Sequence, residues 1–193
     1  MKLNSKYWEN RYKNNDIGWD CGMITTPLKD YIDQISDTSL KILIPGAGNS
    51  YEFEYLIQKG FTNVSVLDYA PTPLNKLKEK FPHVDEKDFI EKDFFKLENQ
   101  FDVIIEQTFF CALDLELRIK YAKKMHSLLK PKGIIVGVLF QFPLTEVGPP
   151  FGGSIEEYQK LFQTDFHIKK LETAYNSIKP REGKELFFIF TKK

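Results

Sequence analysis

Two glycines and one aspartate have a spacing that is typical of proteins that bind nucleosides. Gly46 and Gly48 follow the apolar segment KILIP, and an amphipathic stretch begins directly after them. Because glycine has no Cβ atom, it lets the backbone approach a ligand closely and adopt positive φ values. Asp68 ends a second apolar segment 22 residues after Gly46, where a carboxylate can accept hydrogen bonds from both ribose hydroxyls of an adenosine. Together these residues predict a site for a nucleoside-bearing cofactor.

The glycine turn itself discriminates between two such cofactors, a nicotinamide dinucleotide and S-adenosylmethionine. The dinucleotide fingerprint reads G-x-G-x-x-G, and its third glycine lets the helix pack closely beside the pyrophosphate. Here the turn reads G-A-G-N-S-Y, so Tyr51 occupies the third position. The bulky ring favours a cofactor without phosphates, S-adenosylmethionine. An NAD(P)-dependent oxidoreductase on a Rossmann-like fold is the alternative hypothesis.

A third short segment, EKDFF, follows a predicted strand and adds two candidates for the same site. A carboxylate there can accept a hydrogen bond from the adenine amino group, and an aromatic neighbour can pack on the adenine ring. We therefore predict that Asp93 and Phe94 also bind the cofactor.

The hydrophobic periodicity of the chain predicts the framework that brings these residues together. Two helices have predicted starts, one at Pro27 with Thr26 as its cap and one opened by Thr72 and Pro73. A further helix is expected near the amino terminus, where Tyr7, Trp8, Arg11 and Tyr12 have helix-like spacing. Strands are predicted at 40–45, 64–70, 88–94, 101–107, 133–140, 166–175 and 184–193, and helices at 50–60, 71–81, 114–129 and 154–162.

The alternation of these strands and helices predicts the fold class. Strands that alternate with helices form a parallel sheet that is covered on both faces, because crossover connections are right-handed. The last two strands follow one another without a helix, which is typical of a closing antiparallel hairpin. We predict one domain, residues 1–193, with a doubly wound, mostly parallel, seven-stranded α/β sheet.

Charge and composition make several classes of partner improbable. Lysine plus arginine and aspartate plus glutamate both number 27, so no net charge attracts nucleic acid or an acidic membrane. The longest apolar run, 133–140, is far shorter than the roughly 18 residues of a membrane-spanning helix. Two cysteines and a polar amino terminus favour a cytoplasmic protein. We expect a small-molecule acceptor as partner and take a monomer as the default.

Several motifs together resemble the thiopurine S-methyltransferase superfamily, particularly its bacterial members and the plant halide and thiol methyltransferases. These are YWENRYKNNDIGWDCG, ILIPGAGNSYEFEYL, VLDYAP, FDVIIEQTFFCAL, LLKPKGIIV and GPPF, and they span essentially the whole chain in order. The resemblance implies a class I methyltransferase that depends on S-adenosylmethionine. It also implies that residues 1–26 form an arm over the cofactor and that residues 141–153 form a loop at the acceptor site.

The resemblance assigns further site residues by position. Trp8, Tyr12 and Trp19 would cover the cofactor, and aromatic faces stabilise a desolvated sulfonium cation by about 0.5–2 kcal/mol each. Gln107 is expected to touch the cofactor or the acceptor. Phe110 and Phe151 are expected to line the acceptor site.

The expected reaction is transfer of a methyl group to a small soft nucleophile, a thiol, a sulfide or a halide, by in-line displacement. Such a reaction depends mainly on positioning and desolvation, so no catalytic residue and no metal ion are predicted. A thiol with a pKa near 8.5 supplies some thiolate without a base. A cofactor-binding module without catalytic activity is the remaining alternative.

Overall fold

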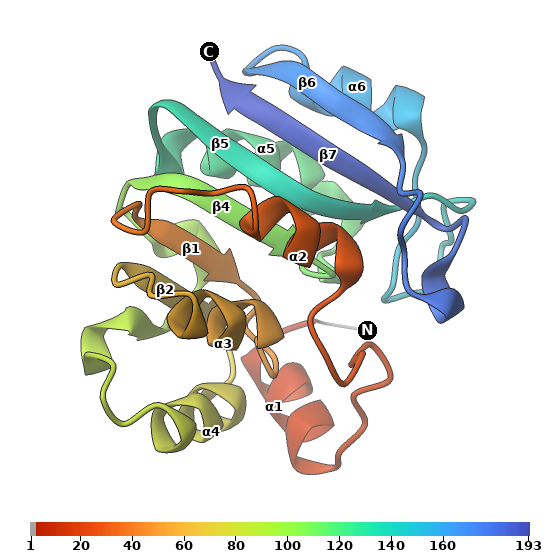
Figure 1. Ribbon diagram of the computed structural model, residues 1–193. Coiled ribbons are helices and arrows are strands. Elements are labelled where there is room, and N and C mark those ends of the chain that lie inside the picture. The colour runs from red at the N-terminus through yellow and green to blue at the C-terminus, as the bar shows by residue number, and fades with distance from the viewer. Residues whose placement is uncertain (1–2) are drawn as a thin grey trace.

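The computed structural model describes residues 3–193, which are built around one seven-stranded sheet (Figure 1). Its strands follow the order β3-β2-β1-β4-β5-β7-β6. Neighbours from β3 to β5 are parallel, whereas β7 is antiparallel to both β5 and β6. The strand bounds are β1 Ile42–Pro45, β2 Val64–Asp68, β3 Phe89–Glu91, β4 Phe101–Gln107, β5 Leu129–Phe140, β6 Phe166–Thr173 and β7 Glu185–Lys192. The predicted doubly wound α/β fold with a closing hairpin is confirmed.

The helices cover both faces of the sheet. They are α1 Ser5–Lys13, α2 Thr26–Ile32, α3 Tyr51–Gln58, α4 Pro71–Lys80, α5 Arg118–Leu128 and α6 Ile155–Phe162. The buried residues of α2, α3 and α4 pack in one core cluster, and those of α5 and α6 pack in the other. Side chains of β1 alternate between the two clusters, with Leu43 in one and its neighbours Ile42 and Ile44 in the other. None of the helices within 3–193 has the length and apolar character needed to cross a membrane.

Several predicted boundaries are wrong by a few residues. Thr25, not Thr26, is the cap residue of α2, and its hydroxyl bonds Gln107 instead of the helix. Helix α4 begins at Pro71, the first residue of the predicted range 71–81, and its cap residue is Ala70, so Thr72 and Pro73 lie within its first turn. Strand β5 begins at residue 129 because Leu129 pairs with Phe101, so the preceding helix ends earlier than predicted.

The topology places a crevice at one edge of the sheet. Strand β1 lies between β2 and β4, so the chain order reverses there and the connections leave to opposite sides. Ligands of open α/β sheets bind at the carboxyl ends of the strands at such a point. The amino-terminal arm runs along this edge, where Ser5 donates a hydrogen bond to the carbonyl of Tyr69 and Glu9 accepts two from Thr72.

Candidate functional site

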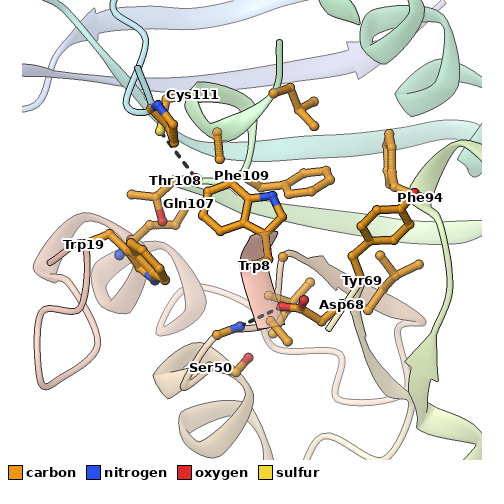
Figure 2. Close-up of a pocket in the computed structure, with 18 of the residues that line it drawn as sticks. Trp8, Trp19, Ser50, Asp68, Tyr69, Phe94, Gln107, Thr108, Phe109 and Cys111 are labelled. Atoms are coloured by element: carbon orange, nitrogen blue, oxygen red, sulfur yellow. Dashed lines mark hydrogen bonds between the residues drawn. The ribbon is translucent and has the colours of Figure 1, made fainter. Parts of the chain in front are cut away.

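A cavity of about 700 Å³ opens at the carboxyl ends of β1, β2 and β4 (Figure 2). Its volume lies within the roughly 300–1,000 Å³ that is usual for small-molecule sites. The arm, the turn after β1, the ends of β2 and β4, the segment 92–95 and the loop 149–150 form its wall. The cavity therefore lies where the topology predicts a ligand.

The glycine turn forms the floor of the cavity. Gly46 and Gly48 both have positive φ values, 69° and 51°. A Cβ atom on Gly46 would lie 2.7 Å from Cδ2 of Phe109, and one on Gly48 would lie 3.7 Å from the Tyr12 hydroxyl. At residue 46, glycine is therefore required both by the positive φ value and by the close packing against Phe109. At residue 48, glycine is required mainly by the positive φ value.

Asp68 is buried at the end of β2 and faces the glycine turn. Its Oδ2 accepts hydrogen bonds from the Gly48 N–H at 3.3 Å and the Tyr12 hydroxyl at 3.4 Å, and its Oδ1 accepts one from Ala70 N–H at 2.9 Å. Burial raises the pKa of this carboxyl, and the backbone N–H donors of Ala70 and Gly48 oppose that rise. The two bonds at Oδ2 are long, so this oxygen has capacity for stronger donors such as ribose hydroxyls.

A buried hydroxyl in the cavity wall is available to a polar ligand. Ser50 precedes α3 with a φ of 46°, and its side chain is 3% exposed. No described residue hydrogen-bonds its Oγ. The backbone N–H groups of the first turn of α3 also have no partner within the helix. These donors fit the amino-acid carboxylate of S-adenosylmethionine, as Asp68 fits its ribose.

The arm contributes an aromatic cluster to the cavity. Trp19 packs edge-on against Trp8 at a centroid distance of 5.6 Å and against Tyr12 at 5.7 Å. The arm is fastened to the glycine turn because Asp20 Oδ2 accepts hydrogen bonds from Asn49 at 2.6 Å and Tyr51 at 3.2 Å. This cluster is consistent with an aromatic cover for a sulfonium cation.

The end of β4 is organised by a fully buried carboxylate. Glu106 accepts hydrogen bonds from the backbone N–H groups of Phe109 and Phe110, both at 2.9 Å, and from the Tyr121 hydroxyl. The chain turns sharply at Thr108, which has a φ of 58°. Beside it, Gln107 Oε1 accepts a 2.6 Å hydrogen bond from Thr25. The turn after β4 is thus held rigidly at the edge of the cavity.

The structure brings together all the residues that the sequence assigned to the cofactor. The following residues line the one cavity: Trp8, Tyr12, Trp19, Gly46, Gly48, Asp68, Asp93, Phe94 and Gln107. Asp93 also caps a short 3-10 turn by accepting a hydrogen bond from Phe95 N–H, and Phe94 stacks on Tyr121. Their roles in binding stay predictions.

The two residues assigned to the acceptor lie elsewhere. Phe110 is 1% exposed and packs in the core against Tyr121 and Tyr158, and Phe151 is 7% exposed. Neither side chain is part of the cavity wall, which contains Phe109 and the prolines 149 and 150 instead. The cavity therefore does not support direct acceptor contacts by Phe110 and Phe151, and their neighbours are better placed for them.

The sequence analysis did not predict several charged or polar residues of the wall, among them Asp20, Cys21, Glu52 and Arg181. Asp20 and Cys21 lie within the predicted arm, but only the aromatic residues there carried a chemical signal. Glu52 resembles an ordinary first-turn acid of a helix. Arg181 lies 162 residues from its arm partner Trp19, and no local pattern predicts such a contact.

Two buried carboxyl groups give the stability of the protein a pH dependence. Burial raises the pKa of Glu52 and Glu106 from 4.5 to about 7. Because the folded state binds these protons more tightly than the unfolded state, the free energy of unfolding falls as the pH rises from about 4.5 to about 7. We expect Glu52→Gln to remove about 1–3 kcal/mol of this fall, measured by urea unfolding at several pH values. Glu79→Gln, at an exposed position, should leave the fall unchanged; equal curves for wild type and Glu52→Gln would contradict the expectation.

Metal-ligating residues do not cluster in the part of the chain that the structure describes. No group of three or more histidine, cysteine, aspartate or glutamate side chains within residues 3–193 is arranged to hold an ion. The site consists of an aromatic cover, a glycine floor and a buried carboxylate.

Comparisons with known proteins identify the family. The profile described as Thiopurine S-methyltransferase matches residues 3–191. A probable thiol methyltransferase 2 of Arabidopsis thaliana is 29% identical over 184 residues, which cover 92% of this chain and 81% of that protein. A thiopurine S-methyltransferase of Vibrio campbellii is 28% identical over 177 residues, covering 82% of this chain and 81% of the relative.

A solved structure supports the same fold. The 1,6-didemethyltoxoflavin-N1-methyltransferase of Burkholderia thailandensis, solved with S-adenosylhomocysteine, superposes with a TM-score of 0.73 at 16% identity, covering 99% of this chain and 87% of that one. The family match does not support the alternative of a nicotinamide-dependent oxidoreductase. The chain belongs to the thiopurine S-methyltransferase family and is an S-adenosylmethionine-dependent methyltransferase.

Proposed function

We propose that this enzyme methylates a small soft nucleophile, a thiol, a sulfide or a halide, by in-line displacement. The observation that carries the proposal is a single cavity with two differently built halves. Asp68 and the glycine turn form one half, which suits the nucleoside of the methyl donor. Phe109, Phe140 and the Pro149–Pro150 segment lie in the other, where apolar side chains beside the Arg181 guanidinium suit a weakly hydrated, soft acceptor. The thiol methyltransferase relative from Arabidopsis thaliana supports sulfur as the accepting atom.

The residues of the chain position and desolvate the reactants. Bound S-adenosylmethionine supplies an electrophilic methyl group on a sulfonium. The Trp8, Tyr12 and Trp19 side chains form an aromatic cover, which excludes water and favours the positive charge. Phe109 is fixed by the bond from its N–H to Glu106, so the acceptor half keeps its shape. Two reactants that are already held in line have lost their translational and rotational entropy on binding, so this loss no longer adds to the barrier of the methyl transfer.

The apolar side chains of the acceptor half fit a mechanism without a catalytic base. A soft anion or thiolate loses its hydration shell when it enters, and this makes it more nucleophilic toward the methyl group. A thiol whose pKa is near 8.5 is already ionised to about 3% at pH 7, and this fraction grows as the pH rises. The rate with a thiol acceptor is therefore expected to increase about tenfold per pH unit below the acceptor's pKa, whereas the rate with iodide is not.

An acceptor panel tests the proposed function. The purified enzyme is incubated with methyl-labelled S-adenosylmethionine and with thiols, sulfides, halides and, as hard controls, an alcohol and an amine. We expect labelled product from at least one soft acceptor and none from the hard controls. Methylation of the alcohol or amine in preference to every soft acceptor would overturn the proposal. Donor binding without transfer to any acceptor would favour the non-catalytic module.

We also propose the setting in which the enzyme acts. The equal numbers of acidic and basic residues favour a small-molecule acceptor over nucleic acid, and the two cysteines, described as free thiols, are compatible with the cytoplasm. Residues 1–26 serve as the arm over the methyl donor, and residues 141–153 as the loop beside the acceptor, within one domain that spans 1–193. A monomer is the expected state, and size-exclusion chromatography with light scattering measures it.

A further inference from the structure

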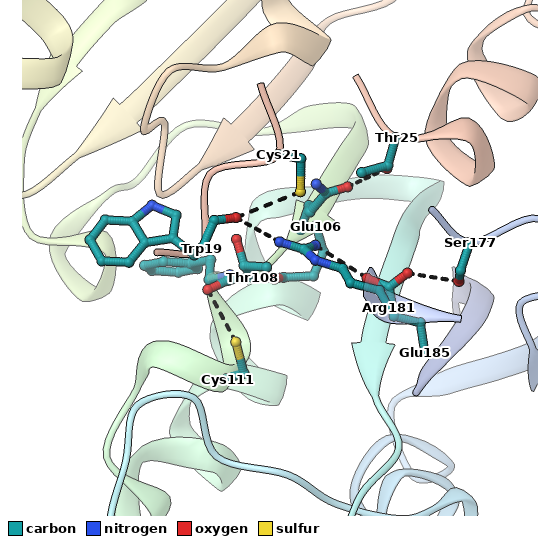
Figure 3. A network of polar contacts seen from close by, with 11 residues as sticks. Trp19, Cys21, Thr25, Glu106, Thr108, Cys111, Ser177, Arg181 and Glu185 are labelled. Atoms are coloured by element: carbon teal, nitrogen blue, oxygen red, sulfur yellow. Dashed lines mark hydrogen bonds and ion pairs between the residues drawn. The ribbon is translucent and has the colours of Figure 1, made fainter. Parts of the chain in front are cut away.

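Arg181 joins the two ends of the chain at the wall of the cavity (Figure 3). The residue is 8% exposed and belongs to a short 3-10 turn between β6 and β7. Its Nη2 donates a 2.7 Å hydrogen bond to the backbone carbonyl of Trp19, and its Nη1 pairs with Glu185 at 3.2 Å. A single guanidinium thus ties the amino-terminal arm to the carboxyl-terminal hairpin.

The guanidinium is held in place from several sides. Glu185, which is 1% exposed, accepts hydrogen bonds from Arg181 on Oε1 and from the Ser177 hydroxyl on Oε2, the latter at 2.8 Å. The Arg181 guanidinium carbon also lies 5.6 Å from the centroid of the Phe140 ring. The planar guanidinium donates to two acceptors that lie in different directions, Glu185 Oε1 and the Trp19 carbonyl oxygen. A lysine ammonium lacks this fixed geometry and would not serve both acceptors equally well. The position of the Trp19 carbonyl is therefore set by the hairpin.

Fixing the backbone of Trp19 fixes the aromatic cover. The Trp19 ring contacts both Trp8 and Tyr12 edge-on, so the three side chains form one packed cluster with Trp19 at its centre. The same carbonyl accepts a 3.6 Å hydrogen bond from the Cys21 thiol, which is too long and too weak to replace the guanidinium. Without Arg181, the arm keeps its contacts with α4 and, through Asp20, with the glycine turn, but the backbone carbonyl of Trp19 loses its hydrogen bond to a charged group.

We propose that Arg181 is a positioning residue for methyl transfer, which acts through Trp19 by holding the aromatic cover over the methyl donor. This rests on the donor occupying the cavity as proposed above, but not on the identity of the acceptor. The guanidinium pre-organises the arm, so less entropy is lost when the donor binds beneath it. Removal of the anchor weakens donor binding more than acceptor binding, because the guanidinium hydrogen-bonds the arm, whereas it meets the acceptor half at the Phe140 ring.

The tryptophan content of the protein makes the arm directly observable. Its two tryptophans are Trp8 and Trp19, so intrinsic tryptophan fluorescence reports on the arm alone. The full-length protein is titrated with S-adenosylhomocysteine, and both the dissociation constant and the amplitude of the fluorescence change are measured. The variants are Arg181→Met, Arg181→Lys and Glu185→Gln. Lys192→Met is the matched control, because Lys192 also donates to a backbone carbonyl, that of Leu129, outside the cavity wall.

We expect Arg181→Met to raise the dissociation constant about tenfold, as the loss of one charged hydrogen bond predicts, and to reduce the fluorescence amplitude. Arg181→Lys should recover part of the affinity, and Glu185→Gln should shift it in the same direction as Arg181→Met but less. With an acceptor found by the panel, KM for S-adenosylmethionine should rise more than KM for the acceptor.

Wild-type affinity and amplitude in both Arg181 variants would overturn the proposal. If Arg181→Met does not fold, as judged by circular dichroism, Arg181→Lys and Glu185→Gln decide, and wild-type values in both would again overturn it. Equal rises in KM for donor and acceptor would do the same, because they would indicate a general loss of structure. Failure of the acceptor panel leaves these binding measurements intact, so the two proposals fail separately.

Discussion

Asp68→Ala is expected to weaken S-adenosylhomocysteine binding by a factor of about 100 to 10,000. The factor corresponds to the loss of two hydrogen bonds between a carboxylate and ribose hydroxyls, at about 1.5–3 kcal/mol each. The side chain is buried at the end of β2, and its long contacts to Gly48 and Tyr12 leave its Oδ2 available to a ligand. Isothermal titration calorimetry measures the affinity.

Unfolding measurements on the Asp68 variants distinguish the loss of a ligand contact from a general loss of structure. Asp68→Ala leaves the Ala70 N–H without its acceptor, which costs about 1–3 kcal/mol. Asp68→Asn keeps an acceptor for that N–H and should bind more weakly than wild type while unfolding nearly as wild type does. Asp88→Ala is the matched control, because Asp88 accepts a hydrogen bond from Ser65 but lies outside the cavity wall. Unchanged affinity in both Asp68 variants would remove the ribose assignment.

The part of the site that could be predicted is the part that local sequence determines. The turn after β1 and the end of β2 lie side by side in any sheet in which these strands are parallel neighbours. The positions of Gly46 and Asp68 in the sequence therefore predict that the two residues lie close together at the carboxyl edge of the sheet. The same holds for Asp93, which follows the next strand in the sheet. Alternating strands and helices predict this neighbourhood without knowledge of any side-chain contact.

The acceptor half could not be predicted because its shape depends on one unusual backbone conformation. Thr108 has a positive φ, which is uncommon for a residue with a branched Cβ and rotates the following residues relative to a regular strand. As a result Phe109 faces the cavity and Phe110, which the sequence analysis assigned to the acceptor site, enters the core. The buried carboxylate of Glu106 bonds both of their N–H groups, and this stabilises the turn.

The loop at residues 148–153 shows the same difficulty. Phe151 donates its N–H to the carbonyl of Cys111, and Arg118 donates to the carbonyl of Gly152, so the loop is fastened to the turn after β4. This fastening buries the Phe151 side chain and turns the two preceding prolines toward the cavity. Contacts between segments 30 to 40 residues apart have no local signature, and a motif that predicts a loop at the acceptor site does not say which of its side chains points inward.

Gly46→Ala is expected to lower kcat/KM at least about tenfold, more than its effect on stability explains. The new Cβ atom would lie 2.7 Å from Cδ2 and 3.0 Å from Cβ of Phe109, so the ring must move into the cavity or the turn must shift away from the donor. A displacement of about 1 Å in a positioned reactant can cost on the order of a hundredfold in rate. A positive φ adds a backbone cost of about 1–2 kcal/mol for any residue other than glycine. Steady-state kinetics and thermal unfolding of the same preparation separate these two effects.

Gly60→Ala provides the matched control, because it isolates the backbone cost. Gly60 has a φ of 85°, but no atom lies within 4 Å of the position that its Cβ would take, and it ends α3 on the side away from the cavity. Its alanine variant should lose only the backbone part of the stability that Gly46→Ala loses, and it should keep wild-type kinetics. If both variants reduced kcat/KM equally, the close approach of Gly46 to Phe109 would have no role of its own, because a general loss of rigidity would account for both. A loss of kcat/KM in Gly46→Ala alone would assign a role to the close approach of Gly46 and Phe109. The floor of the donor half meets the wall of the acceptor half at this contact, so a side chain at residue 46 would shift one half relative to the other.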